Sequence, residues 1–332
     1  MSHSTDQPTP DTSVPALLMP DGSRYAGEPL DASRRRSIAI QDHSEQAKRL
    51  EADQDHARLD FFYHQGRFWR AIVPLAGIDQ VFGQAFNFSR ARRTGKSQKI
   101  LYDRHGLPKR TNPVLNHLQA RFTLQGDHAI ELFPLDCTDQ SAPVHRLHDF
   151  IYSLEAVGPP GVSFNLRDAL SGNLIGAHRF LSTQEMVFER IVVENQYVTE
   201  TPPLPLQEQH KRALLEKALL RSHTAGMSEP YYLYRFLRTN NCTSNPFQML
   251  DTVVDYQLAQ RLGSLLYRFP ISPRLYLRIR GLDSDPSVRK LVRQEFADYV
   301  GHPETQQRKR EFVRAKTKAI RAARKTRESE NA

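Results

Sequence analysis

The chain contains 332 residues, of which 39% are hydrophobic and 25% are charged, a balance typical of a globular protein. Its net charge of +9 is unevenly placed, because residues 1–60 hold 7 Lys and Arg against 11 Asp and Glu, whereas residues 301–332 hold 10 against 4. Dense cysteine, periodic glycine and apolar runs of about 18 residues are all absent from the sequence. These absences argue against a disulfide scaffold, a collagen-like chain and a membrane-spanning helix.

The first sixty residues lack a sustained apolar pattern. Residues 1–45 are rich in Ser, Thr, Asp and Pro, and residues 46–62 fit a short polar helix. We therefore predict that residues 1–60 form a mostly disordered extension. Residues 1–16 contain neither the basic nor the apolar part of a signal peptide, so the chain as written indicates a cytoplasmic location.

Strands are predicted through the first half of the remaining chain. Two buried strands fit residues 67–88, and apolar residues alternate with polar ones from Leu118 to Leu124. A Gly-Asp turn and a second apolar run over residues 129–135 then predict a hairpin. Residues 150–154 and 186–193 complete the predicted strands, because both are short runs rich in apolar residues.

Helical periodicity dominates the second half. We predict helices over residues 206–223, 246–266, 287–299 and 308–327. Strands followed by helices indicate an α+β fold, with an antiparallel sheet packed on helices. The predicted organisation is an extension, one domain and a basic helical tail, over residues 1–60, 61–300 and 301–332.

The segment Thr-Asn-Asn-Cys-Thr-Ser-Asn-Pro places Cys242 shortly before the helix predicted from Pro246. A thiol at a helix N-terminus is stabilised as a thiolate by the helix dipole and by nearby backbone N–H groups. The same groups can stabilise an oxyanion. An inert, buried cysteine among capping residues explains the local sequence equally well.

A nucleophilic thiol needs a base, and His117 at the start of a predicted strand is suited to that role. The alternation places Leu118, Ala120, Phe122 and Leu124 on one face and His117, Gln119, Arg121 and Thr123 on the other. A bend at Asn116 and His117 is then needed to turn the ring toward Cys242. We predict a ring nitrogen within about 4 Å of Sγ. The competing histidines are His105, His128, His145, His148 and His178.

No cofactor or metal is predicted. Cys137, His145 and His148 are the only metal candidates, and they lack both a C-x₂-C pair and a fourth ligand. Gly158-Pro159-Pro160-Gly161 cannot present successive backbone N–H groups to a phosphate, because its prolines carry none.

Residues 239–245 resemble the "NNCTTN" signature of the Lnb N-terminal periplasmic domain family, long catalogued as a domain of unknown function. Residues 150–156 resemble its strand ending in a Ser-x-Glu element. Residues 186–195 and 199–206 resemble the segment that leads into its long helix. The resemblance covers residues 80–265.

The resemblance implies a permuted papain-like (NlpC-type) core and a bacterial Cys–His acyltransferase or hydrolase acting on an acyl-bearing lipid or lipoprotein. Carried over by position, Cys242 matches the nucleophile and His117 is the best match for the histidine. Asn241 and Glu155 are weaker matches, for orienting the site or its loop. One departure is Gln84, which stands where some relatives have His in a Phe-Gly-His-Ala-Phe element. Under that alignment the base is missing.

The predicted function is therefore a thiol-dependent acyltransferase or hydrolase that forms a Cys thioester. The alternative is a catalytically inactive protein whose basic tail binds nucleic acid or an anionic surface. The tail carries one aromatic residue, Phe312, which provides little for base stacking.

Overall fold

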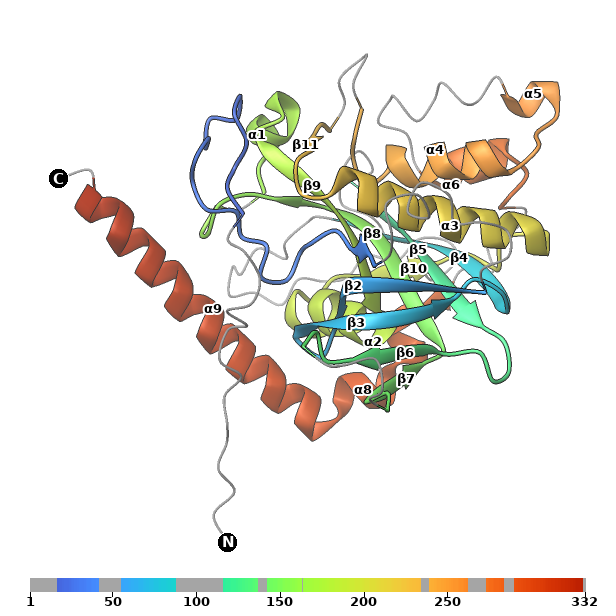
Figure 1. Ribbon diagram of the computed structural model, residues 1–332, viewed down its shortest axis with the longest axis horizontal. Coiled ribbons are helices and arrows are strands. Elements are labelled where there is room, and N and C mark those ends of the chain that lie inside the picture. Colours follow the sequence, from blue (N-terminus) through green and yellow to red (C-terminus); the bar gives the residue numbers. More distant parts are fainter. Residues whose placement is uncertain are drawn as a thin grey trace, which may run out of the picture.

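The computed structural model describes residues 17–41, 55–87, 116–136, 142–162, 164–233, 239–261, 273–283 and 290–330. These segments form a large twisted sheet with helices on two sides, as Figure 1 shows. The predicted α+β class is confirmed. Within the described part of the chain, no helix is both long and apolar enough to cross a membrane.

The sheet is built from twelve strands: β1 (Ala39–Ile40), β2 (His56–His64), β3 (Arg67–Pro74), β4 (Ile78–Asn87), β5 (Asn116–Leu124), β6 (Ile130–Phe133), β7 (His145–Leu147), β8 (Asp149–Val157), β9 (Leu174–Ser182), β10 (Val198–Glu200), β11 (Pro230–Tyr231) and β12 (Lys290–Leu291). Their order is β12-β10-β4-β5-β8-β9-β2-β3-β6-β7, with β1 beside β2 and β11 beside β9. Strands β2 and β9 pair in parallel, so the sheet is mixed rather than purely antiparallel as predicted.

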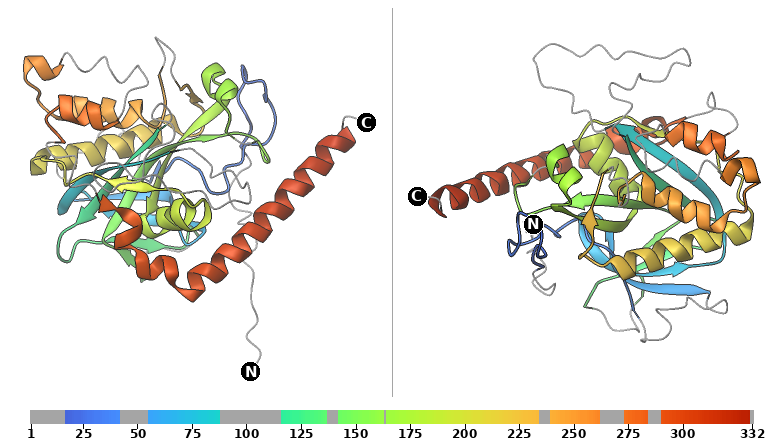
Figure 2. Two further views of the ribbon diagram at one scale, coloured as in Figure 1. Left: turned by 180° about the vertical axis from the view of Figure 1, so that it is seen from behind. Right: turned by 90° about the horizontal axis from the view of Figure 1, so that it is seen from above.

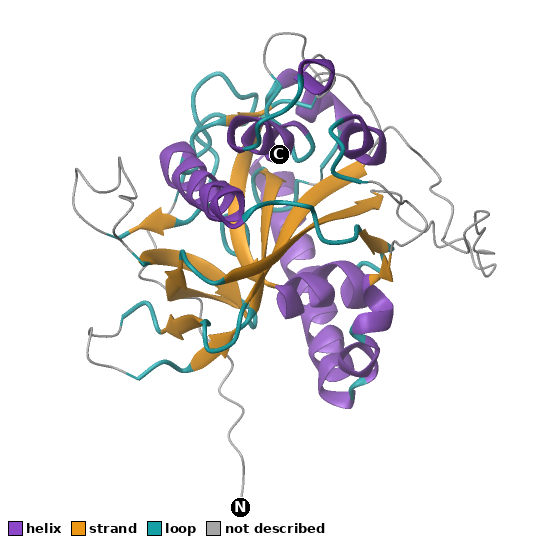
Figure 3. Ribbon diagram, turned by 90° about the vertical axis from the view of Figure 1, so that its right-hand side faces the viewer, coloured by secondary structure: helices purple, strands orange, loops and turns teal. Residues whose placement is uncertain are grey.

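The helices are α1 (Leu166–Ser171), α2 (Thr183–Met186), the π-helix η1 (Val187–Val193), α3 (Glu208–Ala225), α4 (Ser244–Val253), α5 (Leu258–Arg261), α6 (Pro273–Ile279), α7 (Val292–Glu295), α8 (Ala297–Gly301) and α9 (Pro303–Glu330). Figure 3 shows them gathered on two sides of the strands. Helices α3, α4 and α6 lie on one side, and η1 lies on the other with α2, α7 and α8. Helix α9 runs from this second group away from the body.

The alternation predicted for β5 is confirmed and divides the central sheet into two faces. On the apolar face, residues of β5, β8 and β9 pack against α3 and α4: Leu118, Ala120, Phe122, Phe150, Tyr152 and Phe180. On the ionic face, buried polar residues of five strands point toward η1 and α7: Gln84, His117, Gln119, Arg121, Ser153, Glu155, Arg179 and Glu200. The loop carrying Cys242 belongs to the apolar side, whereas His117 belongs to the ionic face.

The predicted hairpin of β5 and β6 is wrong. Strand β5 pairs with β4 and β8, whereas β6 pairs with β3 and β7. The Gly-Asp turn between them changes the direction of the chain without pairing its flanks. Turn chemistry alone cannot reveal this, because pairing depends on which distant strands complete each apolar face.

The strand predicted over residues 186–193 is also wrong, because this segment forms the end of α2 and the π-helix η1. It is buried on nearly every side, so its sequence has no polar face to reveal a helical period. A local signal was available at its start. Ser182 is the N-cap, and its hydroxyl accepts from the backbone N–H of Glu185, in the Ser-x-x-Glu pattern of a capping box.

The N-terminal extension is more ordered than predicted wherever the structure describes it. Residues 17–41 pack on the body, with Met19 and Ile38 buried. The backbone N–H of Ile38 donates to Ser222 of α3 at 3.0 Å. The boundary predicted at residue 60 falls inside β2, and residues 1–16 and 42–54 lie outside the described part.

The four helices predicted for the second half have different outcomes. Helix α3 agrees closely with prediction, and α4 ends at Val253 rather than continuing. Residues 290–301 form a two-residue strand and two short helices instead of one helix. The basic tail is a helix of 28 residues.

Candidate active site

The loop before α4 is organised by the side chain of Asn241. Its Oδ1 accepts hydrogen bonds from the backbone N–H groups of Thr243 and Ser244, both at 2.9 Å. Its Nδ2 donates to the carbonyls of Leu233 at 2.8 Å and Tyr232 at 3.3 Å. These bonds satisfy N–H groups at the start of the helix and tie the loop to the chain after β11. Asn241 therefore orders the backbone on both sides of Cys242.

The Cys242 side chain is buried, with 1% of its surface exposed. Tyr231 donates its hydroxyl hydrogen to Sγ at 3.4 Å, and the backbone of Leu118 and the side chain of Thr243 also hydrogen-bond to the thiol. Burial raises the pKa of Cys242 to about 11, although these three hydrogen bonds act to lower it. At neutral pH the sulfur is therefore a protonated thiol rather than the thiolate that a helix N-terminus alone would favour.

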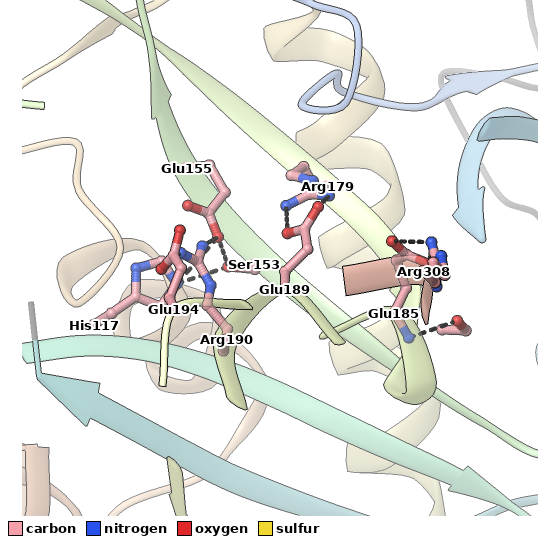
Figure 4. Close-up of polar contacts among 10 residues, drawn as sticks. His117, Ser153, Glu155, Arg179, Glu185, Glu189, Arg190, Glu194 and Arg308 are labelled. Atoms are coloured by element: carbon pink, nitrogen blue, oxygen red, sulfur yellow. Dashed lines mark hydrogen bonds and ion pairs between the residues drawn. The ribbon is translucent and has the colours of Figure 1, made fainter. Parts of the chain in front are cut away.

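His117 lies in a hydrogen-bonded row on the ionic face, which Figure 4 shows. Its Nε2 is 2.7 Å from Ser153 Oγ, which donates to Glu155 Oε1 at 3.0 Å. Because a hydroxyl has one hydrogen and Ser153 gives it to Glu155, the Ser153 oxygen accepts from His117. His117 therefore carries its proton on Nε2, which leaves Nδ1 as the basic nitrogen.

The charges in this row are set by burial and by Arg190. Burial lowers the pKa of His117 to about 3 against the opposing effect of Glu155, so the imidazole is neutral at pH 7. Burial alone would raise the pKa of Glu155, but the positive charge of Arg190 holds it well below its usual range. Arg190 forms an ion pair with Glu155 and a second one with Glu194 at 3.1 Å. Glu155 is thus a buried carboxylate that orients Ser153 and, through it, the ring.

Cys242 and His117 both lie near the start of β5. The backbone of Leu118, the residue after His117, hydrogen-bonds to Sγ, and the charge of Glu155 acts on both the thiol and the imidazole. The contacts of His117 with Ser153 and Glu155 keep its ring on the ionic face. A direct approach of Nδ1 to Sγ across the strand end stays a prediction.

Gln84, which stands at the position of the histidine in some members of the resembled family, is fully buried on the ionic face. Its Nε2 donates to Glu200 at 2.6 Å, and its Oε1 accepts from Gln119 at 2.7 Å. Both ends of the amide therefore have strong partners. This side chain is part of the polar packing between β4, β5 and β10.

A small apolar cavity of about 40 Å³ lies beneath α4, on the apolar face. Its wall includes Leu118 and Tyr152 from the sheet and Pro246, Phe247 and Leu250 from the helix. Leu118 joins this cavity to the thiol, because its side chain lines the cavity and its backbone hydrogen-bonds to Sγ.

His178 is the competing histidine that points to the same side of the sheet as α4. Its Nδ1 is 2.7 Å from the Tyr152 hydroxyl, which donates to Asn245 Oδ1 at 3.3 Å. Among the described residues its Nε2 has no hydrogen-bond partner, and burial holds its pKa well below the usual value. His178 therefore supports the first turn of α4 through Tyr152.

The metal candidates are not brought together by the described residues. Cys137 and the competing histidine His105 lie outside the described part. His145 packs edge-on against Trp69, and His148 Nδ1 is 3.0 Å from the backbone carbonyl of His128. Within the described segments, no group of three His, Cys, Asp or Glu side chains is arranged to hold a metal ion.

Sequence reasoning missed Ser153, Tyr231 and Arg190. The Ser-x-Glu spacing of Ser153 and Glu155 was a usable signal, since residues two apart on a strand share a face. No local pattern points to Arg190 or Tyr231, because each reaches its partner across more than ten residues of chain.

Comparison with protein-family models, curated protein sequences and solved structures finds no match to this chain. The molecule is thus defined by its own geometry: an α+β protein with a buried thiol and a His–Ser–Glu row at one end of a central strand. Its resemblance to the Lnb N-terminal periplasmic domain family stays a prediction.

Proposed function

We propose that the protein is a thiol-dependent acyltransferase or hydrolase with Cys242 as nucleophile. One observation carries the proposal: the backbone of Leu118 hydrogen-bonds to the thiol, and the residue before it, His117, begins a row ending in a buried carboxylate. A nucleophile, a base and a group that orients the base are the three parts that covalent acyl transfer requires.

In the proposed reaction both partners begin neutral. As Sγ of Cys242 attacks an ester or amide carbonyl carbon, its proton passes to Nδ1 of His117. The bond to the leaving group then breaks, and His117 returns the proton to the departing oxygen or nitrogen. Water, or an acceptor hydroxyl or amine, attacks the thioester and regenerates the thiol. Glu155 stabilises the imidazolium that forms in each half of the reaction, acting through Ser153 and at 3.7 Å from Nε2.

We further propose that this domain has a permuted papain-like core and takes an acyl-bearing substrate. Two features support the core: α4 follows the cysteine, and it packs on β5, whose second residue is the histidine. The side of the sheet near the thiol is apolar, and this supports a substrate with an apolar acyl group. Asn241 holds the loop, and Glu155 orients the base.

The test is labelling of the purified full chain by an iodoacetamide probe and by an acyl-ester activity probe. Cys242→Ala should abolish labelling, whereas Cys137→Ala, which removes the only other cysteine of the sequence, should leave it unchanged. His117→Gln should slow acyl-probe labelling by roughly 100-fold, the usual size of a general-base contribution. Labelling that persists in Cys242→Ala, or a wild type that never reacts, would contradict the proposal.

The second candidate is a catalytically inactive protein on the same scaffold. It is favoured by the raised pKa of Cys242 together with the engaged amide of Gln84. In that case alkylation of Cys242 should follow the simple titration of an isolated thiol near pH 11, and His117→Gln should not change its rate. An acceleration that depends on His117 below pH 9 would exclude this candidate.

A further inference from the structure

Helix α9 leaves the body as a single straight arm, which Figures 1 and 2 show from three directions. At 28 residues it is about 42 Å long. Its first turns are fixed to the body: Thr305 is buried, Arg308 pairs with the buried Glu185 at 2.8 Å, and Phe312 packs edge-on against Phe188. The helix is therefore held in a defined direction at one end.

The anchoring residues occupy one side of the helix. With 3.6 residues per turn, Thr305, Arg308 and Phe312 lie within about 60° of one another around the axis. A row of four basic residues runs along the helix at spacings of four, four and three, and we call it the basic stripe: Arg310, Arg314, Lys318 and Arg321. Its centre lies about 120–180° away from the anchors. Anchoring therefore turns the basic stripe outward.

The described side chains of the basic stripe are exposed, and acidic partners do not neutralise their charges. Arg310, Arg314, Lys318 and Arg321 are all exposed. Arg310 donates to the neutral Gln307 at 2.7 Å, and no described acidic side chain forms an ion pair with Arg314, Lys318 or Arg321. A helix with neutralised charges would instead show i,i+4 acidic partners, as Arg212 and Glu216 of α3 do at 2.8 Å.

We infer that α9 is a DNA-binding arm, whose basic stripe neutralises phosphates of double-stranded DNA. A single projecting helix fits the major groove of B-form DNA, which is about 12 Å wide. Small residues on the flank between the stripe and the anchors, such as Ala315 and Ala322, allow the helix to approach the groove closely. Binding of this kind depends on phosphate charge and requires no particular base sequence.

The features of the arm disfavour other polyanions. Single strands are held by stacking on aromatic side chains, and the one aromatic residue of the tail, Phe312, is packed on Phe188. Duplex RNA closes its major groove to a helix. A helix lying on a membrane needs a large apolar face, whereas the described side chains of α9 expose one large apolar residue, Val313. The inference is independent of whether Cys242 reacts.

The experiment measures binding of the full chain to a short mixed-sequence DNA duplex between about 50 and 200 mM salt. Four phosphate contacts predict a slope of about −3.6 for log K against log salt. The variant Arg314→Gln/Lys318→Gln/Arg321→Gln should weaken binding on the order of 100-fold at 100 mM salt and reduce the slope by about 2.7. Circular dichroism confirms that α9 stays helical, since Gln is a good helix former.

The matched control removes the same charge from the other side: Lys309→Gln/Lys316→Gln/Arg327→Gln. It should weaken binding only a few-fold. The charge-preserving variant Arg314→Lys/Arg321→Lys should keep both affinity and slope. Equal losses in the two triple variants would overturn the inference, because they would indicate a diffuse field rather than a face. A slope near zero, or tighter binding to duplex RNA, single strands or phosphatidylserine vesicles, would overturn it as well.

Discussion

The two faces of β5 are both buried, but one is packed with apolar side chains and the other with paired charges. On the apolar face, Phe122 stacks on Phe150 and the sheet meets α3 and α4 mainly through apolar side chains, leaving a cavity of about 40 Å³. On the ionic face, the same strands bury charges that are paired with one another, including Arg179 with Glu189 at 2.9 Å and Arg190 with Glu155. Adjacent residues of one strand therefore lie in environments with very different electrostatic demands.

This difference indicates which face requires one particular arrangement of side chains. Apolar contacts are non-directional, so the apolar face tolerates imperfect packing at a modest cost. Buried charges have no such tolerance, because each depends on one partner in one geometry. The π-helix η1 brings Glu189 and Arg190 into register with Arg179 and Glu155. Its wider turn is found mainly where a helix must place particular side chains, which suits this role.

The largest expected effect comes from breaking the ionic face. Arg190→Met leaves the buried carboxylate of Glu155 without its cation, so we expect the free energy of unfolding to fall by about 4 kcal/mol. Equilibrium urea unfolding measures it. The double variant Arg190→Met/Glu155→Gln removes both charges and should recover at least half of that loss. A single-variant loss below about 1 kcal/mol would mean that water, or protonation of Glu155, compensates the buried charge.

The apolar face should respond less to a comparable truncation. Leu250→Ala removes methyl groups from the wall of the cavity, and we expect a loss of about 3 kcal/mol from lost burial and an enlarged void. Ala218→Val adds two methyl groups at the same cavity and should stabilise the protein by about 0.5 kcal/mol. The same urea titration compares them. A loss after Leu250→Ala that exceeds the loss after Arg190→Met would reverse the ranking of the two faces.

The dependence of stability on pH gives a further comparison of the two faces. His117 has a pKa of about 3 in the folded chain, whereas a free imidazole titrates near 6.5, so between these values the unfolded chain binds a proton that the folded chain does not. Above pH 6.5 this residue therefore does not lower the free energy of unfolding. Below pH 6.5 it lowers that free energy by about 1.4 kcal/mol per pH unit, so the loss reaches about 2 kcal/mol at pH 5.

His117→Gln should flatten that dependence between pH 6.5 and 4, whatever it does to stability at pH 7. His178→Gln is the counterpart on the apolar side, since burial also lowers the pKa of His178 well below its usual value. Unfolding curves collected at several pH values report both slopes. An unchanged slope in His117→Gln would mean that its imidazole gains a proton without loss of the fold.

Much of this fold could be predicted from local sequence patterns. The elements that were predicted wrongly share a physical cause. The alternation along β5 and the periodicity of α3 predict their elements well because each has one apolar and one polar side. The segment of η1 has no such contrast, since its charged residues are as buried as its apolar ones. Apart from the local pair of Arg190 with Glu194, its Glu and Arg side chains are satisfied by partners on β8 and β9, which a local pattern cannot supply.

The candidate site, like the fold, could be predicted from the sequence only in part. The small polar run around Cys242 indicates a structured turn before a helix, and Asn241 provides that turn. The burial of the thiol was not accessible, because it depends on Leu118 and Tyr231 from distant strands. The dipole argument alone favours a thiolate at this position, whereas burial raises the pKa of the thiol to about 11.

The smallest effect is expected at Tyr231, whose hydroxyl lies on the apolar side and donates a hydrogen bond to the thiol. Tyr231→Phe removes a hydrogen bond that lowers the pKa of Cys242, so the pKa should rise further above 11 and alkylation at pH 9 should slow a few-fold. Alkylation rates from pH 8 to 11 measure the shift, and the free energy of unfolding should fall by about 1 kcal/mol. Tyr276→Phe is the matched control, because that buried hydroxyl bonds to Asp251 instead. It should cost similar stability and leave the alkylation rate unchanged. Equal rates in all three proteins would show that burial alone governs the thiol, and that the donors around Sγ do nothing to prepare it for attack.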